Sequence, residues 1–344
     1  MQASRLLLAC AVLVPALALT DRALAAPKVD ETMECMLGVF GDPGTTDECT
    51  LTVVTDASKA ELDKKPHATF RLKIREEATK KELASLAKVP WLEQLEIKGN
   101  DGIDDLSVLS SLKKLRRLNI GDVYALKSLA FVKSLPALEV LDLWNVHVDD
   151  ITPLKSLTKL TKLTLWQDTK DASVIADMTG LTELSATGLD KLGSLSKLVK
   201  LTYLRASPDE ETSLTALAGM TSMKTLRLTG SKKLTDVSAL KGMTALESLE
   251  LGMTPVSDLS AVSGATKLNH LEVSETKVTS LAPLSKIETL KQVDASHTAI
   301  KDFTPLKASA KTLETLYVPD GTPAAAVAML KKENPKLTVY GLKK

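Results

Sequence analysis

Apolar residues recur along the chain in a pattern that repeats about every 22 residues. One copy begins at residues 138–143, where apolar side chains fill positions 1, 4 and 6, and continues with Ile151, Leu154 and Leu157 three apart. The first positions of the repeats are Leu92, Leu115, Leu138, Leu160, Leu181, Leu201, Met223, Leu246, Leu268, Leu290 and Leu313. Steps of 20 to 23 residues over the whole series predict one repetitive architecture.

Each repeat has two halves with different periods. Positions 4 and 6 alternate with polar residues, which predicts a short strand with one buried face. The second half carries apolar residues three apart, as at Leu234, Val237 and Leu240, which is typical of a short helix or a 3₁₀ turn. Pro153 and Pro305 each follow a threonine at the start of such a turn, where proline favours helix initiation.

A single unit of this size cannot offset the entropy of ordering its backbone, so the units must stack on one another. The pattern L-x-x-L-x-L-x-x-[N/T/S]-x-[V/I] resembles the leucine-rich repeat family, and its length resembles the 22-residue, internalin-like class of bacterial surface proteins. The resemblance covers residues 69–318. It implies an α/β leucine-rich repeat solenoid, with a curved parallel sheet on the concave face and short helical or 3₁₀ segments on the convex face.

The chain departs from the family at the position where an asparagine ladder is usual. That position holds Asn100, Val123, Val146, Asp168, Leu189, Asp209, Ser231, Thr254, Thr276 and Thr298. Because hydroxyl groups can bond to loop backbone, we expect a ladder at Thr254, Thr276 and Thr298. The apolar residues cannot make such bonds, so we expect the middle repeats of the arc to be less tightly held. We also expect a local irregularity in the short unit 181–200, where Ala186 replaces the usual leucine.

Segments at both ends differ from the repeats and are predicted to cap the solenoid. Residues 26–68 form the predicted N-terminal cap, with strands at 36–40 and 50–55 and a helical stretch at 56–65. Helical character follows at 78–88. Residues 319–344 form the predicted C-terminal cap, with a helix at 323–333 and a strand at 337–340.

Residues 1–25 have the features of a cleaved signal peptide. Arg5 precedes an apolar run at 6–19, and Ala23-Leu24-Ala25 provides a small-x-small cleavage site. The alternative is a membrane anchor, but the run is shorter than the roughly 20 residues of a spanning helix. A lipoprotein box at Cys10 has too few apolar residues before it. We therefore expect a secreted or periplasmic protein.

Cleavage of the signal peptide removes Cys10 and leaves Cys35 and Cys49. These two are predicted to form a disulfide, because an even pair of cysteines in an oxidising compartment usually does. A metal or redox pair is the alternative, but it lacks C-x-x-C spacing and nearby histidine. Removal of residues 1–25 leaves 42 basic and 42 acidic residues. This balance gives no indication of a nucleic acid partner or an anionic membrane partner.

The sequence contains none of the common catalytic or nucleotide-binding motifs, and it has only four histidines. We therefore expect no enzyme activity, no cofactor and no metal site, and no membrane span after the signal peptide. We further expect a monomer.

Positions 3, 5 and 7 of each strand should face the concave side of the sheet. Trp144 and Trp166 share position 7 in neighbouring repeats, so their rings should lie side by side. The predicted ligand-binding residues are Asp142, Trp144, Lys162, Thr164, Trp166, Tyr203, Arg205 and Arg227. Exposed Trp, Tyr and Arg are typical binding anchors. The alternative is that the two indoles only fill space between strands.

A second group at position 5 is acidic, with Glu250, Glu272 and Asp294 in consecutive repeats and His270 beside them. Like charges on adjacent strands repel, so a cation or a basic partner would relieve the strain. Screening by Lys291 and solvent is the alternative.

Together these features predict an exported, non-enzymatic scaffold that binds a protein through its concave face. The alternatives are a glycan-binding envelope protein that uses the Trp pair as a platform, and a structural envelope protein without a specific ligand.

Overall fold

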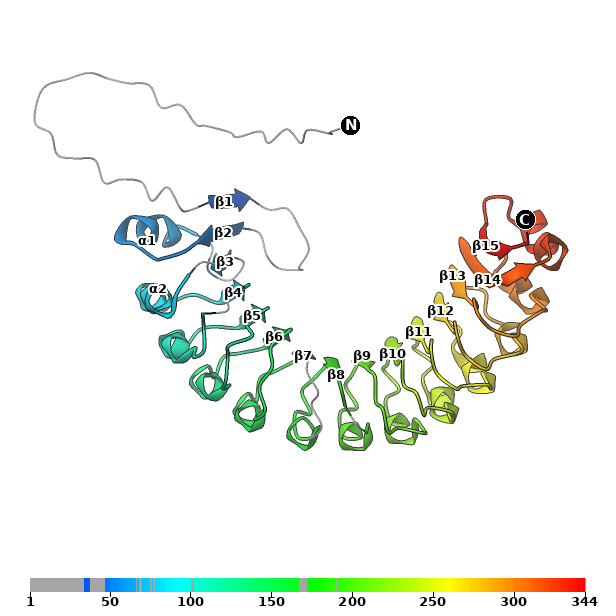
Figure 1. The fold of residues 1–344 in the computed structure, drawn as a ribbon, viewed down its shortest axis with the longest axis horizontal. Helices are drawn as coiled ribbons and strands as arrows, with labels where there is room; N and C mark the ends of the chain where they lie inside the picture. Colours follow the sequence, from blue (N-terminus) through cyan, green and yellow to red (C-terminus); the bar gives the residue numbers. More distant parts are fainter. Residues whose placement is uncertain are drawn as a thin grey trace, which may run out of the picture.

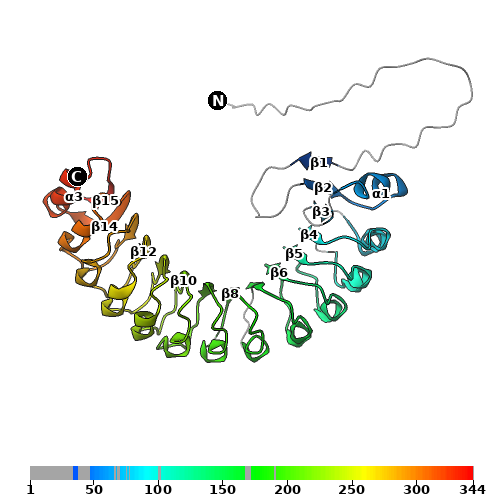
Figure 2. The ribbon, with the colours of Figure 1, turned by 180° about the vertical axis from the view of Figure 1, so that it is seen from behind.

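The computed structural model describes residues 34–37, 47–65, 67, 70–74, 76, 78–99, 102–166, 172–189 and 191–343. The predicted signal peptide, Cys10, Asn100 and Asp168 lie outside these residues. The chain forms an open arc with its strands on the inner side and its helical turns on the outer side (Figure 1). Figure 2 shows the same arc from behind, with the two ends of the described chain at its two tips.

Fifteen strands in the described residues form one sheet in strict chain order, and from β2 onward all neighbours are parallel. The strands are β1 (Glu34–Leu37), β2 (Asp47–Leu51), β3 (Phe70–Ile74), β4 (Gln94–Lys98), β5 (Arg117–Gly121), β6 (Val140–Trp144), β7 (Lys162–Trp166), β8 (Glu183–Thr187), β9 (Tyr203–Ala206), β10 (Thr225–Arg227), β11 (Ser248–Glu250), β12 (His270–Glu272), β13 (Gln292–Asp294), β14 (Thr315–Thr322) and β15 (Thr338–Leu342). This is the predicted leucine-rich repeat solenoid.

Helical segments on the outer side are short, and most are 3₁₀ helices. The α-helices are α1 (Asp56–Leu62), α2 (Lys80–Leu83) and α3 (Ala328–Glu333). The 3₁₀ helices are η1 (Ala84–Lys88), η2 (Ser107–Ser111), η3 (Ala130–Ser134), η4 (Thr152–Ser156), η5 (Ala172–Val174), η6 (Gly193–Leu195), η7 (Thr215–Leu217), η8 (Ser238–Gly242), η9 (Ser260–Gly264), η10 (Ala282–Leu284), η11 (Thr304–Ser309) and η12 (Ala324–Val327). Three-residue spacing of the apolar positions matches the three-residue turn of this helix type.

Positions 1, 4 and 6 of each repeat build a continuous core between the sheet and the outer turns. Leu138, Leu141 and Leu143 are at most 1% exposed, as are their equivalents in the next repeat. All belong to one cluster that runs from Cys49 to Leu337. Pro153 lies in the first turn of η4, as its predicted role as a helix initiator requires.

The ladder position divides into a hydroxyl part and an apolar part. Thr254, Thr276 and Thr298 each donate a hydrogen bond to the carbonyl three residues earlier, at 2.6, 2.7 and 2.6 Å. This confirms the predicted bonding of these hydroxyls to backbone. Val123 and Val146 are instead buried, at 0% and 1% exposure. Apolar packing therefore replaces hydrogen bonding in that part of the arc.

The irregularity expected at residues 181–200 is not found in its strand. The register passes through β8 without a shift, and Ala186 is buried opposite Ala206 of β9. The next repeat differs instead: it forms an additional parallel bridge between Ser213 and Asp236. Pro208 stands in that repeat where several others place a residue with positive φ, a conformation that proline cannot adopt.

The N-terminal strands begin two to three residues earlier than predicted, and β1 runs antiparallel to β2. In this register Cys35 lies opposite Cys49. Directly opposed residues of such a pair have Cα atoms about 4.5–5.5 Å apart, which a disulfide can span. The register therefore supports the predicted disulfide, which remains a prediction.

At the C-terminal end, α3 and β15 lie close to the predicted helix and strand. Val327, Leu330 and Leu337 are each at most 1% exposed and join the core of the repeats. β15 pairs with β14 and is the last strand of the sheet. These contacts support a capping role for residues 319–344, which we retain as a prediction.

Candidate functional site

The concave face carries three columns of side chains that follow from the strand register. Because side chains alternate along a strand, positions 3, 5 and 7 lie on the face opposite the core. Trp144 and Trp166 fall in the position-7 column of β6 and β7, and Asp142 pairs with Thr164 in the position-5 column. The exact parallel register thus brings together residues about 22 positions apart in the sequence.

The two tryptophans contact each other at the middle of this face. Their ring centroids are 5.8 Å apart with an interplanar angle of 61°, so they meet edge to face rather than in a parallel stack. Trp144 is 39% exposed, and Trp166 is partly buried. Gly121 is the β5 neighbour of Trp144, and a Cβ there would make an ordinary van der Waals contact with the indole, 3.5 Å from Trp144 Cε3.

A cation flanks each indole. Lys98 Nζ lies 5.8 Å from the centroid of Trp144, and the Arg205 guanidinium carbon lies 5.0 Å from that of Trp166. Both distances fall within cation–π range. The order Lys98, Trp144, Trp166, Arg205 therefore forms a cationic-aromatic row, with its most exposed aromatic ring at Trp144. Lys98 was missed by the sequence analysis, although position 7 of the repeat at Leu92 would have identified it.

A second chain of contacts links the predicted ligand-binding residues to the acidic group. The Arg227 guanidinium carbon lies 5.9 Å from the Tyr203 ring, and Arg227 Nε lies 3.0 Å from Glu250 Oε1. His270 Nε2 is 3.6 Å from the same carboxylate oxygen. Glu250 is therefore neutralised within the concave face.

The other two acidic side chains also have donors close to them. Glu272 accepts hydrogen bonds from the Gly252 N–H at 2.9 Å, from the Ser274 N–H at 3.0 Å, and from the Ser274 hydroxyl. Asp294 accepts from the Ser296 N–H at 2.9 Å and from its hydroxyl at 2.6 Å. These bonds reduce the expected repulsion without a cation. The described residues contain no cluster of three or more potential metal ligands.

Glycine at 252 is required by this arrangement. A Cβ at that position would lie 2.1 Å from Glu272 Oε1, so any other side chain would displace the carboxylate. The sequence pattern contained the relevant signal, a glycine in the position-7 column, but it did not reveal the close approach.

The remaining predicted residues differ in accessibility. Thr164 is only 9% exposed, so it contributes little to the outer surface of this face. Lys162 Nζ forms an ion pair with Glu183 Oε2 at 3.0 Å. Asp142 and Lys162 line a small hollow on the concave face that also includes Arg71 and Arg117. The two arginines were not among the predicted residues, although both occupy position 3 of their repeats.

A polar cluster lies beside Trp144, just beyond the end of β6. Asn145 Nδ2 donates to Asp122 Oδ1 at 2.9 Å and to the Tyr124 hydroxyl at 2.7 Å. Tyr124 is 51% exposed. Asp122 and Asn145 both have positive φ, near 56°. The exposed Tyr124 and the partly buried Asn145 amide therefore extend the accessible surface from Trp144 towards the side of the arc.

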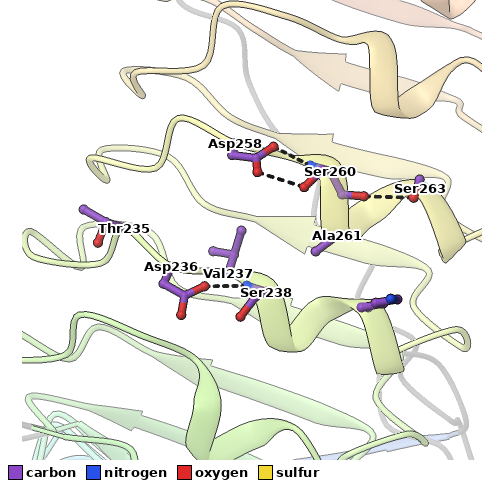
Figure 3. A pocket seen from close by; sticks show the side chains of 9 residues that line it. Thr235, Asp236, Val237, Ser238, Asp258, Ser260, Ala261 and Ser263 are labelled. Atoms are coloured by element: carbon purple, nitrogen blue, oxygen red, sulfur yellow. Dashed lines mark hydrogen bonds between the residues drawn. The ribbon is translucent and has the colours of Figure 1, made fainter.

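The outer side has a hollow between η8 and η9, in which Asp236 and Asp258 are prominent (Figure 3). Each aspartate accepts a hydrogen bond at 2.8 Å from the N–H of the first helical residue, Ser238 or Ser260. These hydrogen bonds from backbone and hydroxyl lower the pKa of both carboxyl groups. The carboxylates thus serve as helix caps, and we assign no ligand to this hollow.

No protein-family model matches the sequence, and no curated protein matches it either. The described architecture is that of a leucine-rich repeat solenoid. Among solved structures, the chain is similar to an internalin of Listeria monocytogenes, with 22% identity, a TM-score of 0.72, and coverage of 86% of this chain and 87% of that one. The predicted internalin-like form of the fold is therefore confirmed.

Two further structures share the fold. A leucine-rich repeat protein of Leptospira interrogans has 16% identity and a TM-score of 0.60, with 85% of this chain and 81% of that one covered. The Arabidopsis receptor kinase HAESA, in complex with a peptide hormone and a co-receptor, has 18% identity and a TM-score of 0.58. That match covers 80% of this chain and 48% of HAESA. None of the helices that the structure describes has the length and hydrophobicity needed to cross a bilayer.

Proposed function

We propose that the protein is an exported, non-enzymatic scaffold that binds a protein partner through its concave face. The observation that carries this proposal is the cationic-aromatic row, in which Trp144 remains 39% exposed between Lys98 and Trp166. Tryptophan and arginine side chains, both present in this row, are enriched in binding hot spots. The fold supports this proposal, since HAESA is seen with a peptide hormone and a co-receptor.

Export rests on the signal-peptide features of residues 1–25 and on the cysteine pair. Cys35 and Cys49 face each other in adjacent strands, which suits an oxidising compartment. The partner is therefore a protein of the periplasm, the cell surface or the surrounding medium.

The proposal is tested by capture and titration with mature protein that starts at Ala26. Proteins bound from the envelope and culture medium of the source cells are identified by mass spectrometry, then purified and titrated calorimetrically. We expect the Trp144→Ala/Trp166→Ala variant to bind at least about 30-fold more weakly, the loss expected for a hot spot of 2 kcal/mol. Val199→Ala, which removes an exposed apolar side chain elsewhere, serves as the matched control. Equal affinity of the tryptophan variant and the control would refute the site.

Glycan binding is the second candidate, and the cluster beside Trp144 favours it. Trp144 and Tyr124 offer exposed rings for a sugar to stack on, while Asn145 and Asp122 offer polar groups next to them. A glycan array probed with the same variants distinguishes the two functions. If the ligand is a glycan, the wild-type protein binds to the array in the absence of any protein partner. Exposure of Trp144 counts against the third candidate, a structural protein without a ligand.

A further inference from the structure

A small hollow lies on the concave face across β3 to β7. Its volume is about 50 Å³, and its polar lining includes Arg71, Gln94, Arg117, Asn119, Asp142 and Lys162. We call it the Arg117 hollow. Three cationic side chains and one carboxylate, that of Asp142, surround it.

Most of the charges in the lining already have partners. Arg71 Nη1 lies 3.5 Å from Glu96 Oε2, and Lys162 Nζ lies 3.0 Å from Glu183 Oε2. Asp142 also takes part in an interaction of its own. Glu96 and Glu183 of the surrounding sheet are therefore already paired with cationic side chains.

Arg117 is the exception. Within the part of the chain that the structure describes, its guanidinium makes no hydrogen bond and no ion pair, and the same holds for the amide of Asn119 two residues later. In the sheet, Arg117 stands between Gln94 and Val140, which are both neutral. A partly buried guanidinium between neutral neighbours retains most of its capacity to bind an anion.

The size and chemistry of the Arg117 hollow point to one type of group. A planar guanidinium presents a fork of N–H donors that matches a carboxylate. A volume near 50 Å³ is more than the roughly 10–15 Å³ that a single water molecule needs in the same measure, so the hollow has room for a small polar group such as a carboxylate. We propose that the Arg117 hollow receives the carboxylate of an acidic side chain from the protein partner, and this rests on the proposed function for the class of partner.

Strand geometry relates this site to the tryptophan pair. Arg117 occupies position 3 of β5, and Trp144 occupies position 7 of β6, the next strand. Four residues along a strand span about 13 Å. A partner that contacts both therefore presents an acidic side chain about 13 Å from an apolar or aromatic group. Such a two-point contact fixes the orientation of the partner across the strands.

The proposal is tested with an acidic peptide probe, which can be used before the partner is identified. Fluorescein-labelled hexaglutamate is titrated at low salt with mature wild-type protein, with Arg117→Gln and with Lys311→Gln, and anisotropy is measured. Lys311 is an exposed outer residue, so its variant removes the same charge elsewhere. We expect Arg117→Gln to weaken binding at least about tenfold, as for loss of one charge-assisted hydrogen bond, and Lys311→Gln to leave it unchanged. Circular dichroism confirms that both variants are folded.

Three results would overturn the proposal. An unchanged affinity in Arg117→Gln, or an equal loss in Lys311→Gln, would show that the probe senses only general charge. Tighter binding of an oligogalacturonate that competes with hexaglutamate would assign the hollow to an acidic glycan. Failure here is separate from failure of the proposed function, because partner capture that depends on Trp144 but not on Arg117 would reject only this inference.

Discussion

At the scale of single residues, the turn after each strand is held by two adjacent positions. The first of them has positive φ in several repeats, including Asp122, Asn145 and Met253, a conformation that is uncommon for residues other than glycine. The second is the ladder position, where the Thr254 and Thr276 hydroxyls donate to the backbone carbonyls of Leu251 and Val273. Hydroxyl bonding thus replaces the asparagine ladder of the family.

Thr276→Val tests the contribution of one such hydroxyl. Valine has nearly the same shape and already occupies this position at Val123 and Val146, so the change removes the bond that the hydroxyl donates to the Val273 carbonyl at 2.7 Å and the longer one it accepts from the Val278 N–H at 3.4 Å. We expect the free energy of unfolding to fall by about 1 kcal/mol, measured by urea denaturation. Thr221→Val, at an exposed threonine, is the control and should change stability by less than about 0.5 kcal/mol. An equal change in the free energy of unfolding of the two variants would show that the Thr276 hydroxyl does not contribute to stability.

At the scale of elements, aspartate caps recur at the start of the outer turns. Asp105, Asp150, Asp236, Asp258 and Asp302 each accept a hydrogen bond at 2.8 Å from the N–H two residues later. Hydrogen bonds lower the pKa of all five carboxyl groups, and for Asp105 the Lys80 ammonium contributes most and brings the pKa to about 2. The repeated cap links the helical half of each repeat to its turn.

These caps predict a loss of stability in acid. Because the folded-state pKa values lie below the ordinary value near 3.9, the folded state binds fewer protons than the unfolded chain in this range. The stabilisation is complete above about pH 4 and is lost as the pH falls through the folded-state values, towards about 2 for Asp105. Thermal melts between pH 5 and pH 2 should show a shallower decline for Asp236→Asn/Asp258→Asn than for wild type. Parallel curves would contradict the role of the caps.

At the scale of the whole molecule, stability depends on contacts between neighbouring repeats. Arg116 of one repeat binds Glu139 of the next at 2.8 Å and lies 3.5 Å from Glu93 of the previous one. The core is likewise continuous from Cys49 to Leu337, so each repeat is covered only by its neighbours. A repeat at either end therefore needs a different segment to cover its apolar side.

Removal of residues 319–344 tests this requirement at the C-terminal end. The truncation takes away Leu330 and Leu337, which are buried with the repeats, and it removes the pairing of β15 with β14. We expect the truncated mature chain to aggregate or to melt at a lower temperature, as judged by gel filtration and calorimetry. A chain that lacks only Lys343 and Lys344 should behave as wild type. A soluble, monomeric chain ending at Val318 would refute the capping role.

The linear sequence determined the solenoid, because a period of about 22 residues repeats the same buried positions and forces identical strands to stack in parallel. It also determined the position-7 column that joins Trp144 and Trp166, since a parallel register follows from equal repeat lengths. Only the tertiary structure decided which side chains on that face are already paired. Glu250, Glu272 and Asp294 find donors through space or through local turns, whereas the Arg117 guanidinium finds no acceptor among the described residues, and no periodic pattern encodes that difference. The reason is physical: repeat spacing sets the positions of backbones, while hydrogen bonds and exposure depend on rotamers and close contacts such as that between Gly252 and Glu272.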